Sequence, residues 1–105
     1  MEQYLDNEEN IVKLIWKNKN INTLHCLFKD CPNITYVDFS NFNSKNVESI
    51  SFLFENCISL TSVNFNNFDS SILFYIKNIF QNCISLNSID LSNLDTSIVL
   101  CMFFP

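Results

Sequence analysis

The sequence predicts an α/β repeat fold, a solenoid in which short parallel strands alternate with short helical or 3-10 segments. The first observation is a period of 26 residues, because the stretch that begins at Phe28 aligns without a gap with those that begin at Phe54 and Phe80. The other two observations are an apolar pattern of strand type and one of helix type inside each repeat. A fixed period of roughly 20–50 residues is typical of stacked repeats that bury apolar side chains against their neighbours.

The first half of each repeat predicts a short strand. The segments that begin at Ile34, Leu60 and Leu86 share the pattern LxxLxL, and their last two apolar residues flank a polar one. Alternation with a period of two is typical of a half-buried strand. Stacked at a spacing of about 4.8 Å, these strands would form a parallel sheet.

The second half of each repeat predicts a short helix or 3-10 turn. Apolar residues recur at positions 47, 50, 53 and 54, which is the spacing of one helix face. Asn-Ser, Asp-Ser or Asp-Thr pairs precede this half at 43–44, 69–70 and 95–96. We expect their side-chain oxygens to cap the first turn by accepting hydrogen bonds from free amides.

The chain divides into two parts within one domain. Residues 1–26 are expected to form an N-terminal cap with a partial repeat, in which Val12, Leu14 and Trp16 alternate with other residues as in a first strand. Residues 27–105 are expected to form three 26-residue repeats, the last of them incomplete. An open last repeat would expose apolar side chains and a strand edge. We therefore expect self-association through the open C-terminal end, or a fragment of a longer array.

Composition excludes several partners. The 105 residues carry a net charge of −5 with six Lys and no Arg, which argues against nucleic-acid binding and against an anionic membrane surface. The acidic, polar stretch MEQYLDNEEN at the N-terminus lacks the pattern of a signal peptide, and the longest late apolar run, 98–104, is too short to span a bilayer. A cytoplasmic, reducing location follows as an expectation. Glycine is absent, so Asn, Asp or Ser must form the tight turns.

The repeats FENCISLTSVNFNNFDSSI and FQNCISLNSIDLSNLDTSI closely resemble the BspA-like leucine-rich repeat, whose usual form reads roughly MFxxCxSLxxLDLSNFDTSNVxxM. The resemblance covers residues 27–104. It implies a right-handed leucine-rich-repeat solenoid of the kind found in surface and adhesion proteins that bind host proteins or cells. It therefore implies a non-catalytic module for protein–protein interaction, with a protein partner of unknown identity.

Three rows of equivalent residues, 26 apart, are expected to be structural. Stacked cysteines form a line rather than the four ligands around one point that zinc needs, so small buried side chains explain them better. An asparagine row can satisfy backbone groups of adjacent turns. The rows are Phe28, Phe54 and Phe80; Cys31, Cys57 and Cys83; and Asn41, Asn67 and Asn93.

Two further sites are alternatives. His25, Cys26 and Cys31 form a partial ligand set or thiol–imidazole pair, although one His and no second motif make a weak site. Two rows of oxygen-bearing side chains offer calcium ligands, or else caps of the following turn. These rows are Asp38, Asn64 and Asp90, and Asn43, Asp69 and Asp95. We find no catalytic pair or phosphate-binding loop, and we expect no enzyme activity, cofactor or metal.

The outward positions of the strands are the candidate binding face. They carry small polar side chains, and Tyr36 is the one obvious anchor, since interface hot spots are usually Trp, Tyr or Arg. A solvated sheet face without a partner is equally compatible with this composition. The candidate residues are Thr35, Tyr36, Asp38, Thr61, Asn64, Asn66, Asn87, Asp90 and Ser92.

Overall fold

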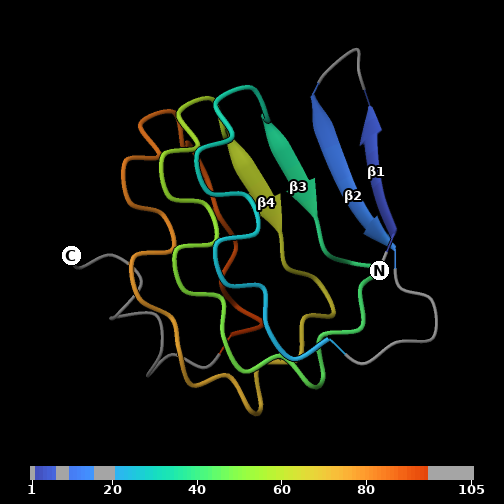
Figure 1. Ribbon diagram of the computed structural model, residues 1–105. Coiled ribbons are helices and arrows are strands. Elements are labelled where there is room, and N and C mark those ends of the chain that lie inside the picture. Colours follow the sequence, from blue (N-terminus) through green and yellow to red (C-terminus); the bar gives the residue numbers. More distant parts are fainter. Residues whose placement is uncertain (1, 7–9, 16–20, 95–105) are drawn as a thin grey trace.

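The computed structural model describes residues 2–6, 10–15 and 21–94, and Figure 1 shows the arrangement of its strands. Four strands form one sheet in the order β1-β2-β3-β4. They are β1 (Glu2–Asp6), β2 (Ile11–Ile15), β3 (Tyr36–Asp38) and β4 (Ser62–Asn64). β1 pairs with β2 in antiparallel fashion, and the pairs β2–β3 and β3–β4 are parallel.

The N-terminal segment supplies the first parallel strand. In the register of the sheet, Val12 of β2 lies beside Val37 of β3, which lies beside Val63 of β4. All three valines are buried, because each occupies the inward position of its strand. β1 pairs with the other edge of β2, so β1 and not β2 is the edge strand at that end of the sheet.

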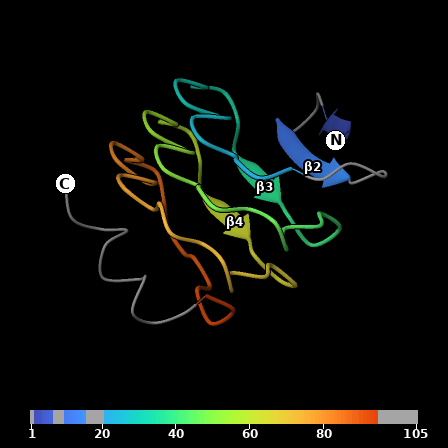
Figure 2. The same cartoon turned by 60° about the horizontal axis from the view of Figure 1, so that its bottom comes forward.

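A second set of backbone hydrogen bonds joins the same segments away from the strands. We call residues 23–30, 49–56 and 75–82 the first, second and third rungs. Amides at alternate positions of the first rung donate to carbonyl oxygens of the second, for example Leu24 N to Ser49 O at 2.9 Å and Phe28 N to Leu53 O at 3.0 Å. The second rung donates to the third in the same way. The rungs lie side by side in both views of the molecule (Figure 1 and Figure 2).

The rungs are turns, and the described residues contain no helix, whereas the sequence predicts short helical or 3-10 segments here. Some amides do reach back three residues as in a 3-10 turn, such as Leu53 N to Ile50 O at 3.1 Å. However, each rung has positive φ at two positions, which in the second rung are Phe52 (59°) and Asn56 (63°). A residue in the left-handed region ends a right-handed helix and turns the next amide toward the neighbouring rung. The local spacing cannot reveal this.

Phenylalanine rings fill the space between the sheet and the rungs. Phe54 stacks between Phe28 and Phe80, with ring centroids 5.7 Å apart on both sides and nearly parallel planes. Phe39 stacks on Phe65 at 5.5 Å and meets the edge of Phe54 at 6.2 Å. The rows of equivalent residues thus pack on themselves and on each other, which buries the apolar area that stabilises the fold.

The third repeat lacks the strand that its LxxLxL pattern predicts. Residues 86–91 are not a strand in the structure, and one backbone bond, Asn87 N to Thr61 O at 3.0 Å, joins them to the preceding repeat. Leu86, Ile89 and Leu91 are only partly buried against the core. The predicted strand residue Trp16, the predicted cap at 95–96 and the predicted open C-terminal end lie outside the described residues.

Candidate interaction surfaces

The predicted binding face follows the outer side of β3 and β4 and continues into the third repeat. Its members in the first two repeats are half-buried, apart from the exposed Asn66. Those of the third repeat are all exposed, namely Asn87, Asp90 and Ser92. The exposure of the predicted residues therefore differs between the repeats. Their accessibility rises toward the end where the regular strands stop.

Hydrogen bonds within the chain already use much of this face. The side-chain oxygens of Asp38, Asn64 and Asp90 each accept a bond from the amide two residues later, at 2.8–2.9 Å. Bonds from the side chain and the amide of Ser92 lower the pKa of the Asp90 carboxyl. The Thr61 hydroxyl donates to the Thr35 carbonyl at 3.0 Å. The row proposed as calcium ligands thus closes turns.

Tyr36 is a weak anchor in its present position. Its ring is half-buried on β3, and burial together with the nearby Asp38 carboxylate raises the pKa of its phenol. A hydrogen bond with Asn64 opposes that rise. The phenol is thus engaged with the neighbouring strand rather than directed at a partner.

The second oxygen-bearing row also closes turns where the structure describes it. Asn43 Oδ1 accepts a bond from Lys45 N at 3.2 Å, and Asp69 Oδ1 accepts one from Ser71 N at 2.9 Å. Bonds from Ser71 lower the pKa of Asp69. These contacts match the capping alternative, and the third member, Asp95, lies outside the described residues.

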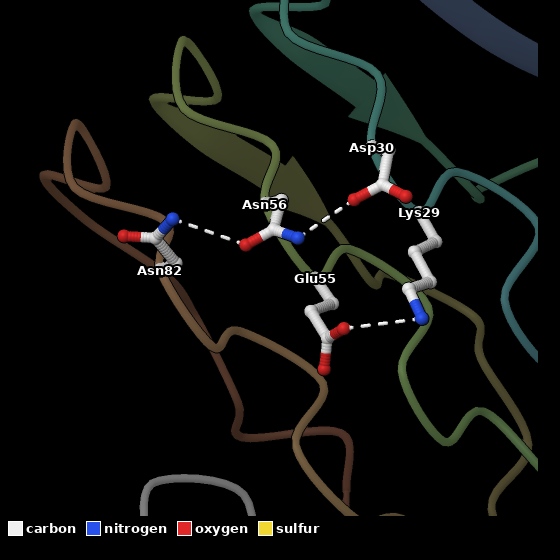
Figure 3. A network of polar contacts seen from close by, with 5 residues as sticks. All are labelled: Lys29, Asp30, Glu55, Asn56 and Asn82. Carbon is white, nitrogen blue, oxygen red and sulfur yellow. Dashed lines mark hydrogen bonds and ion pairs between the residues drawn. The ribbon is translucent and has the colours of Figure 1, made fainter.

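The rungs carry a side-chain network that is not among the sequence predictions. Asn56 Nδ2 donates to Asp30 Oδ1 at 2.6 Å, and Asn82 Nδ2 donates to Asn56 Oδ1 at 3.0 Å. Figure 3 shows these three side chains in line, with the ion pair between Lys29 and Glu55 (3.3 Å) beside them. We call Asp30, Asn56 and Asn82 the amide ladder. Its signal in the sequence is the equivalent third position of FKDC, FENC and FQNC.

Phe52 is in an unusual conformation on the outer side of the second rung. Its φ of 59° is rare for a bulky side chain, and the equivalent positions hold Cys26 and Asn78. The ring meets the edge of the His25 imidazole at 5.7 Å and lies 5.8 Å from Lys29 Nζ. Contacts with the first rung thus hold this ring in place.

An aromatic pair stands exposed at the start of the third rung. Phe74 is 71% exposed and Tyr75 is 63% exposed, while both amides donate to the Glu48 carbonyl. Glu48 and Ser49 occupy the equivalent positions of the preceding repeat. The sequence therefore contained a signal for this site, because an aromatic pair stands where the preceding repeat has two polar residues. Ile84, in the loop after this rung, is 75% exposed.

The cysteine row points inward and is bonded to the backbone. Cys57 Sγ lies 3.0 Å from the Phe28 carbonyl oxygen and Cys83 Sγ lies 3.1 Å from that of Phe54, so each thiol donates to the preceding repeat. Burial raises the pKa of Cys57 to about 12 and that of Cys83 to about 11. Such thiols are protonated at neutral pH and are therefore poor nucleophiles and poor metal ligands.

Two of the three asparagines in the asparagine row donate hydrogen bonds to the backbone of the preceding repeat. Asn67 Nδ2 donates to the Ser40 carbonyl at 3.4 Å, and Asn93 Nδ2 donates to that of Phe65 at 3.1 Å. Asn67 also has a φ of 66°, a conformation that Asn tolerates better than most residues. Asn41 is exposed.

No metal centre is found among residues 2–6, 10–15 and 21–94: no group of three or more His, Cys, Asp or Glu side chains there could hold an ion. His25 faces the Phe52 ring, and Cys31 Sγ lies 3.9 Å from the Lys29 carbonyl. The same part of the chain contains no helix that is long and apolar enough to cross a membrane.

Comparison with known proteins places the chain in a family. The family whose model matches is described as "Mycoplasma protein of unknown function, DUF285", and the match covers residues 1–104. No curated protein and no solved structure matches the chain. The chain therefore belongs to the DUF285 family.

This match corrects the resemblance to the BspA-like leucine-rich repeat. The quoted motif consists of a 26-residue spacing and of Phe, Cys, Leu and Asn positions. In a stacked repeat of this length these positions are buried or lie in turns. Those features follow from stacking itself, so they do not distinguish between families that share the period. The match also includes residues 1–26, which the motif did not cover.

Proposed function

We propose that this DUF285 chain is a short solenoid of stacked 26-residue repeats that acts as a non-catalytic protein–protein interaction module. The inter-rung bonds and the stacked Phe28, Phe54 and Phe80 rings support the stacking. The high pKa values of the inward cysteines, together with the engaged Asp38 and Asp90 side chains, support a role without catalysis.

The exposed pair Phe74 and Tyr75 is the observation that carries the interaction role. Large aromatic side chains are enriched at interface hot spots because they bury much apolar area with little loss of side-chain entropy. Phe74 and Tyr75 are among the few large apolar side chains of the described residues that remain exposed, together with Ile58 and Ile84. We therefore place the centre of the interface on the third rung rather than on the strand face.

The test compares two double variants of the purified chain. Wild type, Phe74→Ser/Tyr75→Ser and the strand-face variant Asn87→Ala/Ser92→Ala are immobilised and exposed to an extract of the source cells. Any protein retained by wild type is then purified and its dissociation constant measured by calorimetry. We expect the dissociation constant of the aromatic variant to rise on the order of tenfold or more for each lost hot spot. The dissociation constant of the strand-face variant should stay at the wild-type value.

Either of two results would overturn the proposal. One is equal affinity of all three proteins for the purified partner, which would show that the aromatic pair takes no part. The other is the absence of any protein that binds wild type with a measurable, saturable affinity. If only the strand-face variant loses affinity, the interaction role is kept and the binding site is assigned to the strand face.

A further inference from the structure

The first two members of the cysteine row, Cys31 and Cys57, lie next to each other in the stack of repeats. Backbone hydrogen bonds between the two repeats flank this pair on both sides. They run from Asp30 N to Glu55 O and from Thr61 N to Thr35 O, both at 2.8 Å. Segments joined in this way lie about 4.8 Å apart. That spacing falls inside the range of about 4.4–6.8 Å between Cα atoms that a disulfide can span.

The Cys57 sulfur lies toward the first repeat. Its Sγ is 3.0 Å from the Phe28 carbonyl oxygen, which also accepts a bond from Cys31 N at 3.2 Å. The sulfur therefore rests against the turn that ends at Cys31. A new bond to Cys57 Sγ would remove its S–H donor, but the Phe28 carbonyl would keep the Cys31 amide as a donor. Oxidation thus leaves no buried acceptor unpaired at this position.

Cys31 is the most loosely held thiol of the row, whose three members are all free thiols. Its Sγ lies 3.9 Å from the Lys29 carbonyl oxygen, whereas the Sγ atoms of Cys57 and Cys83 lie 3.0 and 3.1 Å from their acceptors. Cys31 is also half-buried, while Cys57 is fully buried. A small oxidant can therefore reach Cys31 first. The pair Cys57 and Cys83 is the weaker candidate, because both of its thiols are already held in short contacts with backbone carbonyls.

We propose that Cys31 and Cys57 form a redox latch, a dithiol that oxidised glutathione converts into a disulfide between the first two repeats. The Cys31 thiolate attacks one sulfur of the oxidant, whose S–S bond breaks and releases one glutathione thiolate. The Cys57 thiol then loses its proton to solvent and attacks Cys31 Sγ, so that the second glutathione leaves. Two protein thiols are thereby oxidised by two electrons, and the oxidant is reduced to two molecules of glutathione.

The disulfide would fasten the first repeat to the second. Closing the loop between residues 31 and 57 restricts the unfolded chain, so the oxidised form should be the more stable one. Burial raises the pKa of both thiols, so closure is slow at neutral pH and becomes faster as the pH rises. The latch therefore responds to lasting oxidising conditions rather than to brief ones.

Peptide mapping of the full chain tests the proposal. The reduced protein is incubated with oxidised glutathione at about pH 8.5, the remaining thiols are alkylated, and trypsin digests the chain without reductant. Cleavage after lysine places Cys31, Cys57 and Cys83 in separate peptides, namely 30–45, 46–77 and 78–105. We expect peptide 30–45 linked to 46–77 in a protein that migrates as a single chain without reductant. Urea denaturation should show a higher midpoint for this oxidised protein than for the reduced one.

Matched variants separate the pair from the other thiols. Cys83→Ala should keep the link and the shift in urea midpoint, whereas Cys31→Ser and Cys57→Ala should lose both. Cys31→Ser is the more informative of the two, because it changes a half-buried side chain and leaves the fully buried core residues in place. The proposal is overturned if oxidised wild type lacks the link between 30–45 and 46–77, or if its main link joins 46–77 to 78–105. It is also overturned if the link appears only between two chains, or if the urea midpoint does not rise.

Discussion

The rung side and the strand side of the chain both follow the 26-residue repeat, but backbone pairing between repeats extends further on the rung side. On the strand side, β3 and β4 have three residues each, and regular pairing ends at β4. On the rung side, alternate amides donate between all three rungs, and side chains add the amide ladder. The more regular contact is thus made by turns. Positive φ allows a turn to direct its amides toward the neighbouring repeat. A strand forms such hydrogen bonds only where the neighbouring segment is also extended.

The largest effect should come from removing the ring at the centre of the rung side. Phe54 is fully buried and stacks on a ring at each face, so Phe54→Ala should lower the free energy of unfolding by about 3–5 kcal/mol. Urea denaturation followed by circular dichroism measures this change. A loss of that size would unfold much of a chain of marginal stability.

Phe65→Ala is the matched change on the strand side. Phe65 is as deeply buried but stacks on one ring, Phe39, and meets Phe68 edge-on. We expect Phe65→Ala to lower the free energy of unfolding by about 1 kcal/mol less than Phe54→Ala does, because about 1 kcal/mol is the contribution of one aromatic pair. Equal or larger destabilisation by Phe65→Ala would show that the strand side, not the rung side, holds the repeats together.

A smaller effect of opposite sign is expected at Phe52. Phe52→Asn should raise the free energy of unfolding by about 1 kcal/mol, because Asn enters the left-handed region more readily and occupies the equivalent position 78. The lost contacts with His25 and Lys29 offset part of the gain. Urea denaturation at neutral pH measures the difference.

Phe74→Asn is the control for this prediction. Phe74 is an exposed ring on the rung side, whereas Phe52 is half-buried, and Phe74 is not among the residues with positive φ. The same substitution there should leave stability unchanged or lower it slightly. If both variants are stabilised alike, the gain comes from removing exposed apolar surface and not from the backbone.

The smallest effect is a pH dependence that originates in the cysteine row. Burial raises the pKa of Cys57 from its ordinary 9.0 to about 12, so the folded protein holds this proton more tightly than the unfolded chain. The resulting stability is complete below pH 9.0 and is lost as the pH rises through about 12. Between about pH 8 and about pH 9.5 we expect a loss below about 1 kcal/mol.

Cys57→Ala isolates this contribution. Its own cavity lowers stability at every pH, so the quantity to compare is the change in unfolding free energy between the two pH values. That change should be smaller in Cys57→Ala than in wild type. An identical change in both proteins would mean that Cys57 is not the group that titrates, and Cys83, whose pKa is also raised, would be the next candidate.

The sequence determined the features that depend on period and burial. The 26-residue spacing places Phe28, Phe54 and Phe80 in one row, and apolar alternation marks the inward Val37 and Val63. These features are readable because burial selects residue type at each position, whatever backbone conformation carries it. The strand alternation at Val12 and Leu14 likewise marks where β2 lies.

Only the tertiary structure decided the conformation of the rungs and the chemistry of the surfaces. The spacing of positions 47, 50, 53 and 54 fits a helix as well as a turn, and the choice depends on carbonyls 25 residues away that accept the alternate amides. The same long-range contacts brought Asp30, Asn56 and Asn82 into one ladder and left Phe74 exposed. A residue's own sequence neighbourhood records what it buries, whereas its hydrogen-bond partner and the sign of its φ are set by the next repeat.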